Sequence, residues 1–306
     1  MAGYDFDLFV IGGGSAGVRC ARIAAGHGAR VGVAEERFWG GTCVNVGCVP
    51  KKIMVNAAEY GLWAEDAAAF GWNIEKHGHD WARLAAARDA EVARLSAIYD
   101  KLLKGAGAAT FDARAVMLDP HMIEVGGQRV TAERIVIATG GMPQRLDIPG
   151  AELGLVSDDL FTLKELPRRV AVLGSGYIAV EFASLLRGLG AEVDLVYRAS
   201  LPLRGFDDDI RTALAEALAA QGIRLNPDVS PTRTRGRMTS CCSASRPISC
   251  GKWTRCSSVP AASRIPRASG SMRRAWRWRR TAPSSWMTTM PPAGSTSLPS
   301  ATSSTG

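Results

Sequence analysis

The feature that most constrains the fold is a glycine-rich turn between two apolar runs, which occurs twice in the chain. In its first copy, residues 5–36 read DFDLFVIGGGSAGVRCARIAAGHGARVGVAEE. Gly12, Gly14 and Gly17 have the G-x-G-x-x-G spacing, which permits a tight turn, close approach of a pyrophosphate and close packing of helix on strand. The helix that follows directs its N-terminus at the phosphates. Glu35 ends the second apolar run and can accept hydrogen bonds from a ribose, so this segment predicts a dinucleotide-binding β-α-β unit.

The second copy covers residues 168–204, RRVAVLGSGYIAVEFASLLRGLGAEVDLVYRASLPLR, with G-x-G-x-x-A at Gly174, Gly176 and Ala179. Arg198 and Arg204 follow its second strand, where an acidic residue would accept from a ribose 2′-hydroxyl. Arginines can instead pair with a 2′-phosphate, which favours NADPH; two unrelated surface arginines are the alternative. The two copies predict an α/β protein with two Rossmann-like three-layer domains. We expect the first at residues 1–150 and the second, incomplete, at residues 151–229.

Two cysteines, Cys43 and Cys48, lie five residues apart in GGTCVNVGCVPKK, residues 40–52. An iron–sulfur site would need another cysteine where Lys51 stands, and no histidine lies nearby, so metal binding is disfavoured. On a regular helix, residues five apart differ by about 7.5 Å of rise and about 140° of rotation, too far for a good disulfide. We therefore expect a distorted segment, which Gly47 would permit. The helix dipole and Lys51 or Lys52 would stabilise a thiolate there, which favours a redox-active disulfide over two buried reduced thiols.

The cysteine segment, placed after a G-x-G-x-x-G unit, resembles the glutathione reductases of the flavin-dependent pyridine nucleotide–disulfide oxidoreductases. Val44 and the run Pro50-Lys51-Lys52 match that branch rather than the dihydrolipoamide dehydrogenases. The resemblance implies that the first nucleotide is FAD. It also implies that Cys48 faces the flavin and that Cys43 attacks the substrate disulfide. The FAD site would include Ser15, Ala16, Glu35, Thr42, Lys51 and Thr139.

The resemblance assigns further roles outside the cysteine segment. It adds Ser175 and Ile178 to the NADPH site, makes Tyr177 a gate over the flavin, and makes Glu181 the partner of Lys51. The helical stretch RLSAIY, residues 94–99, is similar to a family helix on which a tyrosine, here Tyr99, packs against glutathione. Arg22 falls at the position of a carboxylate-binding arginine. A surface arginine and a half-buried tyrosine are the alternatives for these two residues. No metal is expected, since His77 and His79 form a pair with no further ligand and fit a solvated loop.

By this resemblance, electrons would pass from NADPH to FAD, then to Cys43-Cys48, and then to glutathione disulfide. The intact family member is expected to be a homodimer, in which a C-terminal histidine of the other subunit protonates the leaving thiolate. The four histidines of this chain are His27, His77, His79 and His121, and none occupies that position.

Charge is distributed unevenly along the chain. Residues 231–306 contain twelve Arg, one Lys and no acidic residue, a charge of +13, which leaves −5 of the total of +8 for the first 230 residues. Asp5 and Asp7 stand where a signal peptide would be basic, and no run of about 18 uncharged apolar residues occurs. We therefore expect a cytoplasmic protein with no membrane association, in which a purely structural disulfide is disfavoured.

The Arg/Ser-rich segment, residues 230–306, resembles nothing expected at this place in the family. A disordered extension that binds nucleic acid is one interpretation, but four Trp and four Cys fit it poorly, and we expect no nucleic-acid partner. Read one nucleotide earlier with permitted codons, PAASRIPRASGSM becomes GRIPNTEGLGLD and GSTSLPSATSSTG becomes VDIFAVGDVIDR. These strings resemble the family's G-R-x-P-N and A-x-G-D stretches. The sequence thus predicts a frame slip between about residues 229 and 245 and a segment without native fold.

Three hypotheses follow from the sequence. The leading one is an NADPH-dependent, FAD-containing glutathione reductase of which this chain is an inactive, interrupted copy. The second is a dihydrolipoamide dehydrogenase or a flavoenzyme related to mercuric reductase. The third is a non-enzymatic nucleotide-binding fragment with a cationic tail.

Overall fold

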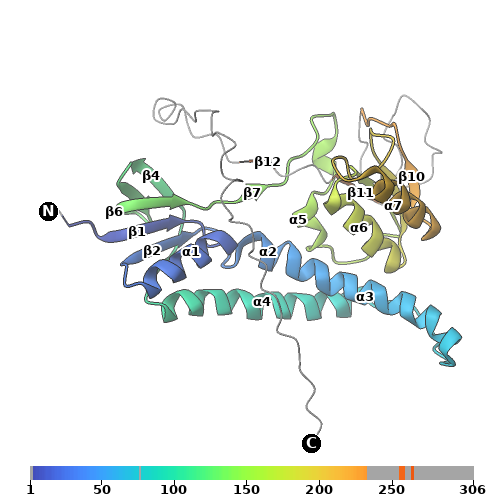
Figure 1. Cartoon of the computed structure of the whole chain (residues 1–306), viewed down its shortest axis with the longest axis horizontal. Helices are drawn as coiled ribbons and strands as arrows, with labels where there is room; N and C mark the ends of the chain where they lie inside the picture. The colour runs from blue at the N-terminus through green and yellow to red at the C-terminus, as the bar shows by residue number, and fades with distance from the viewer. Residues whose placement is uncertain (1–2, 76, 233–254, 259–262, 265–306) are drawn as a thin grey trace, which may run out of the picture. The chain divides into compact units, whose positions relative to one another are not determined.

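Two sheets built mainly from parallel strands organise the part of the chain that the structure describes. The computed structural model describes residues 3–75, 77–232, 255–258 and 263–264 (Figure 1). These residues all belong to the unit Met1–Ile265, and the second unit, Pro266–Gly306, lies outside the described residues. Most of the segment expected to lack a native fold therefore lies outside them as well.

The first sheet has six strands in the order β3-β2-β1-β6-β5-β4. Its strands are Phe6–Ile11 (β1), Val31–Glu35 (β2), Ala109–Asp112 (β3), Ala115–Asp119 (β4), Met122–Val125 (β5) and Gln128–Ile137 (β6). Strands β1, β2, β3 and β6 pair in parallel, and β4, β5 and β6 pair in antiparallel. Helix α1, Ser15–Gly26, connects β1 to β2 and buries Val18 and Ala21 against Val10 and Val33. The β-α-β unit predicted from the first glycine motif is confirmed.

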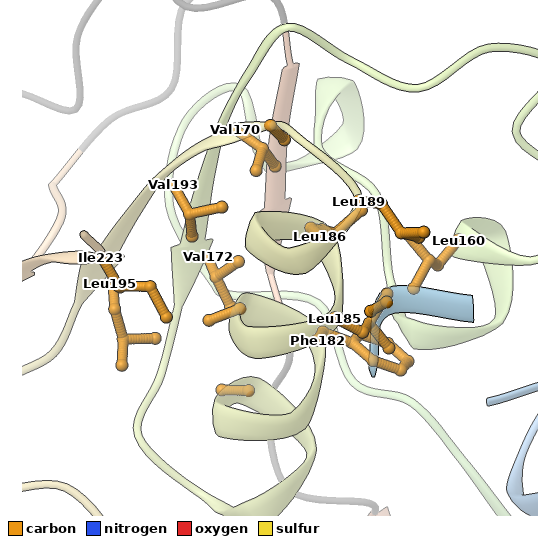
Figure 2. Packing of buried hydrophobic residues seen from close by; sticks show 14 of the residues in the cluster. Leu160, Val170, Val172, Phe182, Leu185, Leu186, Leu189, Val193, Leu195 and Ile223 are labelled. Carbon is orange, nitrogen blue, oxygen red and sulfur yellow. The ribbon is translucent and has the colours of Figure 1, made fainter. Parts of the chain in front are cut away.

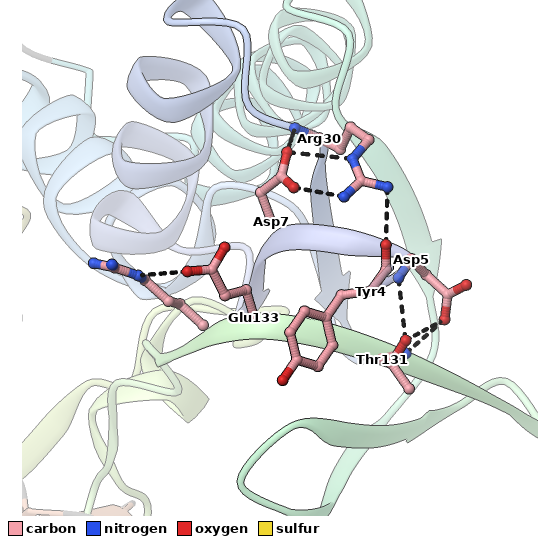
Figure 3. A network of polar contacts seen from close by, with 7 residues as sticks. Tyr4, Asp5, Asp7, Arg30, Thr131 and Glu133 are labelled. Atoms are coloured by element: carbon pink, nitrogen blue, oxygen red, sulfur yellow. Dashed lines mark hydrogen bonds and ion pairs between the residues drawn. The ribbon is translucent and has the colours of Figure 1, made fainter. Parts of the chain in front are cut away.

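Polar contacts fix the start of β1 between its two neighbours (Figure 3). The carboxylate of Asp7 accepts from the backbone N–H of Arg30 at 2.8 Å and from its Nη2 at 2.6 Å. Asp5 Oδ2 accepts from the backbone N–H of Thr131 on β6 at 2.7 Å. These groups are exposed, so each contributes little to stability. They tie the start of β1 to its neighbours, and the glycine turn lies at the opposite end of the strand.

The second sheet repeats the architecture with four parallel strands in the order β10-β9-β8-β11. Its elements are Arg169–Leu173 (β8), Tyr177–Gly188 (α6), Glu192–Val196 (β9), Asp208–Ala220 (α7), Arg224–Asn226 (β10) and Arg255–Ser258 (β11). Figure 2 shows Val170 and Val172 of β8 and Val193 and Leu195 of β9 beside the apolar face of α6. The second β-α-β unit is thereby confirmed. Asp207 caps α7, because its side chain accepts from the N–H of Asp209.

The remaining elements include the helices that carry the cysteines and the segment that enters the second sheet. They are Gly41–Asn45 (α2), Cys48–Asp66 (α3), Ala67–Phe70 (η1), Trp81–Gly105 (α4), Gly141–Met142 (β7), Ala151–Leu153 (η2), Ser157–Leu160 (α5) and Ser263–Arg264 (β12). Helices α3 and α4 lie against each other (Figure 1). Among the described residues, no helix has both the length and the apolar character needed to cross a membrane.

Two short strands lie within residues 230–306, the segment for which the sequence predicts no native fold. The backbone of β11 pairs in parallel with β8, from Arg255 opposite Val170 to Ser258 opposite Leu173. The backbone of β12 pairs in antiparallel with β7. The physical reason is that β8 offers an open edge of backbone N–H and C=O groups, which any sequence can pair.

Candidate functional site

The first glycine turn is shaped by steric contacts that only glycine avoids. Gly12 has φ +114°, and a Cβ there would lie 2.3 Å from the carbonyl oxygen of Ala138. A Cβ on Gly17 would lie 1.9 Å from the carbonyl oxygen of Gly12. Gly14 is the N-cap residue of α1, whose first turn holds no acidic side chain. This cradle leaves backbone N–H groups available at a helix N-terminus, so the residues present fit the pyrophosphate of a dinucleotide.

Glu35 ends β2 beside this turn, as the sequence predicts. Its Oε2 accepts from the backbone N–H of Gly13 at 2.7 Å, and its Oε1 accepts from that of Arg37 at 2.8 Å. Oε1 also accepts from the backbone N–H of Phe38 at 3.3 Å, whereas Oε2 can accept a second hydrogen bond. Glu35 therefore has the position and the remaining acceptor capacity to hold a ribose while it braces the turn.

The residues expected to line the flavin site surround the same turn. Ser15 and Ala16 are exposed in the first turn of α1, Thr42 is exposed on α2, and Thr139 is exposed just after β6. Their backbone positions converge because β1 and β6 are adjacent parallel strands that end at one edge of the sheet.

The cysteine segment is a broken helix. Helix α2 ends at Asn45, Val46 and Gly47 leave helical geometry, and α3 begins at Cys48. A Cβ on Gly47 would lie 2.7 Å from the carbonyl oxygen of Thr42. The predicted distortion is confirmed, and it removes the separation that a regular helix would impose on Cys43 and Cys48. Both thiols are free in this structure, the first half-buried and the second exposed.

The surroundings of Cys43 raise the pKa of its thiol. Burial raises the pKa of the Cys43 thiol, and the hydrogen bond with the Cys48 thiol raises it further, whereas a hydrogen bond with the Ser15 hydroxyl lowers it. Lys51, one of the two lysines expected to stabilise a thiolate, is instead engaged by a carboxylate: its Nζ lies 2.5 Å from Oε1 of Glu181. The structure therefore shows Lys51 paired with a carboxylate rather than with a thiolate.

The glycine turn and the cysteine segment touch through their backbones. The N–H of Gly40 donates to the carbonyl of Gly13 at 2.9 Å, and Gly14 and Gly40 form a parallel bridge. Gly41 has φ +61°, and a Cβ there would lie 2.6 Å from Cα of Gly14. The dithiol therefore lies next to the site that fits the first nucleotide.

Trp39 supports this junction and has no role in the sequence interpretation. Its indole lies against Gly13, where an added Cβ would meet the ring at 2.5 Å. Its Nε1 donates to Oδ1 of Asp112 at 2.7 Å. Its carbonyl accepts from Nδ2 of Asn45 at 3.0 Å and from the hydroxyl of Ser96 at 2.9 Å. Trp39 thus contacts the glycine turn, helix α2 and helix α4. No local sequence pattern indicates that it is buried there.

Helix α3, which begins at Cys48, packs against α6, which begins directly after the second glycine turn. Lys51 contacts Glu181, as the resemblance implies, and a Cβ on Gly188 would lie 2.8 Å from Cβ of Ala58. Both pairs are 130 residues apart in sequence, so the two helices run in the same direction and in one register. Because Lys51 is the fourth residue of α3 and Glu181 the fifth of α6, the two helices meet near their starts.

The second glycine turn has the geometry of the first. Gly174 has φ +125°, Gly176 is the N-cap residue of α6, and Ala179 is fully buried. The carbonyl of Ser175 accepts from the N–H of Leu203 at 2.8 Å, which holds the segment carrying Arg204 beside the turn.

The side chains expected around this second turn differ in exposure. Ile178 is half-buried, whereas Tyr177 is 63% exposed. Arg198 follows β9 by two residues, and it and Arg204 are exposed. Both guanidinium groups are thus accessible to a 2′-phosphate.

The positions of the two residues expected to bind glutathione do not distinguish that role from an ordinary structural one. Arg22 is exposed on α1, and Tyr99 is half-buried on α4, where it packs with the cluster that contains Val10 and Leu103. That packing also suits an ordinary core tyrosine.

His77 is exposed and lies 3.7 Å from a carboxylate oxygen of Glu75. Among the described residues, no group of three or more His, Cys, Asp or Glu side chains is arranged to hold a metal ion.

Known proteins match the same part of the chain. A sequence model described as pyridine nucleotide-disulphide oxidoreductase matches residues 6–246. The glutathione reductase of Burkholderia cepacia is 50% identical over 242 residues, which are 78% of this chain and 54% of that protein. The glutathione reductase of a Nostoc species is 44% identical over 224 residues, which are 73% and 49% of the two chains. The chain thus spans about half the length of the curated relatives it matches.

Solved structures agree with this assignment. The HOCl-induced flavoprotein disulfide reductase RclA from Escherichia coli superposes with a TM-score of 0.71 at 27% identity, over 83% of this chain and 56% of that one. The two Rossmann-like units, the broken cysteine helix and the sequence matches lead to one assignment. The chain belongs to the pyridine nucleotide-disulphide oxidoreductase family.

Proposed function

We propose that the chain derives from a flavin-dependent disulfide reductase that uses NADPH to reduce glutathione disulfide. The observation that carries this proposal is the position of Cys43 and Cys48. The segment that carries them contacts the first glycine turn through Gly40 and Gly41. On the other side, Lys51, on the helix that begins at Cys48, pairs with Glu181 of the second nucleotide unit. Two relatives named glutathione reductase support the choice of substrate.

The roles of the residues follow from their chemistry. The first glycine turn, Ser15 and Glu35 would hold FAD, which would relay the hydride of NADPH to the cysteine pair. The thiolate of Cys43 would attack one sulfur of glutathione disulfide and expel a glutathione thiolate, and the thiolate of Cys48 would then attack Cys43 and expel the second. Burial keeps the pKa of the Cys43 thiol high, so this chemistry needs a base that removes the proton.

A histidine is the group best suited to that proton transfer, because its pKa lies near neutrality. All four histidines of the chain lie at or before His121, and none of them follows the second nucleotide unit. We propose that the complete enzyme takes this group from a partner subunit in a homodimer, and that the present chain cannot supply it.

Use of NADPH rather than NADH is part of the proposal. Arg198 and Arg204 are exposed beside the second glycine turn and would pair with the 2′-phosphate. A frame-restored protein that oxidises NADH as readily as NADPH, or that reduces lipoamide, would favour a dihydrolipoamide dehydrogenase instead.

Strand β11 supports the further proposal that the chain is an interrupted copy. Strands in a parallel sheet with helices on its faces are normally rich in Val, Ile and Leu, and β8 beside it reads RVAVL. The sequence of β11 is RCSS, which does not fit this rule. Codons for Cys, and most codons for Ser, begin with T; in the frame one nucleotide earlier that T becomes the second base, and every codon with T in second place encodes an apolar residue. Cys256 would then become apolar, and so would Ser257 and Ser258 wherever a TCN codon encodes them.

The test compares the chain as written with a protein whose frame is restored between about residues 229 and 245. Each is purified, its flavin absorption is recorded, and NADPH oxidation is followed with glutathione disulfide. We expect activity in the restored protein alone. Activity in neither protein would argue against glutathione reduction as the ancestral function.

A further inference from the structure

Arg88 on α4 is an arginine that lies almost wholly inside the protein, with 2% of its surface exposed. Among the described residues, the other buried charged side chain is Asp194, whose partner Arg224 lies on the neighbouring strand of the same sheet. Burial of a charge is unfavourable unless its hydrogen bonds are made. Arg88 therefore calls for an explanation that the proposed chemistry does not give.

The contacts of Arg88 connect three separate elements. Its Nη2 donates to the backbone carbonyl of Phe161 at 2.8 Å, directly after α5. Its Nη1 lies 3.8 Å from Sδ of Met54 on α3. Its Nε and Nη2 donate to Oδ1 of Asp89 at 2.9 and 2.7 Å, and the side chain of Asp89 is 62% exposed. The guanidinium thus spans from the cysteine-bearing helix to the segment that leads into the second nucleotide unit.

A second donor from α4 repeats this attachment. The indole Nε1 of Trp81 donates to the backbone carbonyl of Leu163 at 3.0 Å, and Trp81 is 6% exposed. The two carbonyls lie two residues apart, and the two donors lie seven residues apart on one helix. Helix α4 therefore holds the residue 161–163 segment at two points.

The contacts continue from this segment to the Lys51–Glu181 pair. The ring of Phe161 packs edge-on against Phe182, with centroids 5.8 Å apart, and Phe182 follows Glu181 directly. Met54, which Arg88 contacts, follows Lys51 by three residues and so lies on the same face of α3. Figure 2 shows Phe182 and Leu185 of α6 beside Leu160, with a stretch of α3 passing close to them. These contacts form a closed path around the ion pair.

We propose that Arg88 is a positioning residue that clamps the second nucleotide unit onto helix α3 and thereby keeps Lys51 in contact with Glu181 beside the cysteines. The planar fork of arginine suits this task, because it can satisfy a carbonyl and a carboxylate at once while its alkyl stem packs among apolar side chains. The importance of the ion pair rests on the proposed function, but the clamp itself can be measured without catalysis.

The experiment uses a zero-length carbodiimide on the full chain. The reagent activates the Glu181 carboxylate, the Lys51 amine attacks it, and an amide forms with net loss of water as the carbodiimide becomes its urea. Peptide mass spectrometry then quantifies the Lys51–Glu181 product. Lys104 and Asp100, 2.8 Å apart within α4, provide an internal reference in the same sample.

Arg88→Met removes the donors and keeps the length of the side chain. We expect the Lys51–Glu181 yield, relative to the reference, to fall at least about fivefold, since a buried carbonyl loses its donor. The matched control is Arg94→Met on the same helix, because Arg94 is exposed and, within the described part of the chain, pairs with Glu91; its yield should equal that of the wild type. Arg88→Lys, which keeps a charged donor, should restore part of the yield.

The measurement is made at a temperature where circular dichroism shows each variant to be folded. A role in stability alone would lower the unfolding midpoint and leave the cross-link unchanged, and that result with folded Arg88→Met would overturn the clamp. If Arg88→Met does not fold, Trp81→Phe decides, because it keeps the aromatic packing and loses one donor. Its yield should fall at least about twofold, and a yield equal to wild type would overturn the proposal. Failure of the frame-restored enzyme to reduce glutathione disulfide would leave this result untouched.

Discussion

Replacement of Gly17 by alanine tests whether helix α1 must lie against the glycine turn as closely as the structure holds it. The added Cβ would lie 1.9 Å from the carbonyl oxygen of Gly12 and 3.2 Å from Cγ1 of Val10. The first contact is about 1 Å shorter than van der Waals packing allows, and it is made to backbone, so the helix or the turn must move. Overpacking typically costs about 1–3 kcal/mol, and a contact this short to the backbone, which cannot rotate away, belongs in the upper part of that range, at about 2–3 kcal/mol.

Helix propensity works against this cost, since alanine is favoured over glycine by about 1 kcal/mol inside a helix. Gly26 at the other end of the same helix provides a matched control, because a Cβ there meets nothing within 4 Å. We therefore expect Gly26→Ala to be neutral or slightly stabilising. Gly17→Ala should lower the free energy of unfolding by about 1–2 kcal/mol after the propensity gain is included.

The assay is thermal unfolding of the full chain followed by circular dichroism. A loss of about 1–2 kcal/mol corresponds to a midpoint lower by about 2–8 °C for a folded region of this size. Binding of FAD by the frame-restored protein should weaken in parallel, because the turn that cradles the phosphates is displaced. A Gly17→Ala variant that unfolds at or above the wild-type midpoint would refute the steric argument for the turn.

Three further outcomes are expected. In the frame-restored enzyme, Cys43→Ser should abolish reduction of glutathione disulfide yet leave flavin reduction by NADPH intact in stopped-flow absorbance; full turnover would exclude Cys43 as the attacking thiol. Arg198→Ala should weaken NADPH binding by about 1.5–3 kcal/mol, or about 10- to 150-fold in dissociation constant, and should weaken NADH binding far less. Equal losses of binding for the two nucleotides would make Arg198 a structural residue. Because burial raises the pKa of the Cys43 thiol, its alkylation should rise with pH later than that of free cysteine, and Ser15→Ala should delay it further by removing a hydrogen bond that lowers the pKa. An earlier rise in Ser15→Ala would contradict that role.

The parts of the fold visible in the sequence are those governed by local pattern. Gly12, Gly14 and Gly17 reveal the first β-α-β unit because their spacing and the apolar runs around them lie within one short segment. The break between Cys43 and Cys48 is visible for the same reason, since Gly47 lies between them.

Contacts between residues far apart in sequence could be predicted only from the family resemblance, or could not be predicted at all. Lys51 and Glu181 are 130 residues apart, and nothing near either residue indicates the other. Trp39 and Arg88 give no local sign that they are buried or which carbonyls and carboxylates they meet. The raised pKa of the Cys43 thiol could not be read from the sequence, because the burial of the thiol depends on tertiary packing.

The most direct test of the central claim is a parallel assay of the chain as written and of the frame-restored protein. Each is purified without added flavin, its absorption is recorded near 450 nm (roughly the flavin band), and NADPH oxidation is followed with and without glutathione disulfide. We predict that the restored protein is yellow and turns over at ordinary enzyme rates of about 1–1000 per second, and that the chain as written does neither. A chain as written that holds flavin and reduces glutathione disulfide at such rates would contradict the claim that it is an interrupted glutathione reductase.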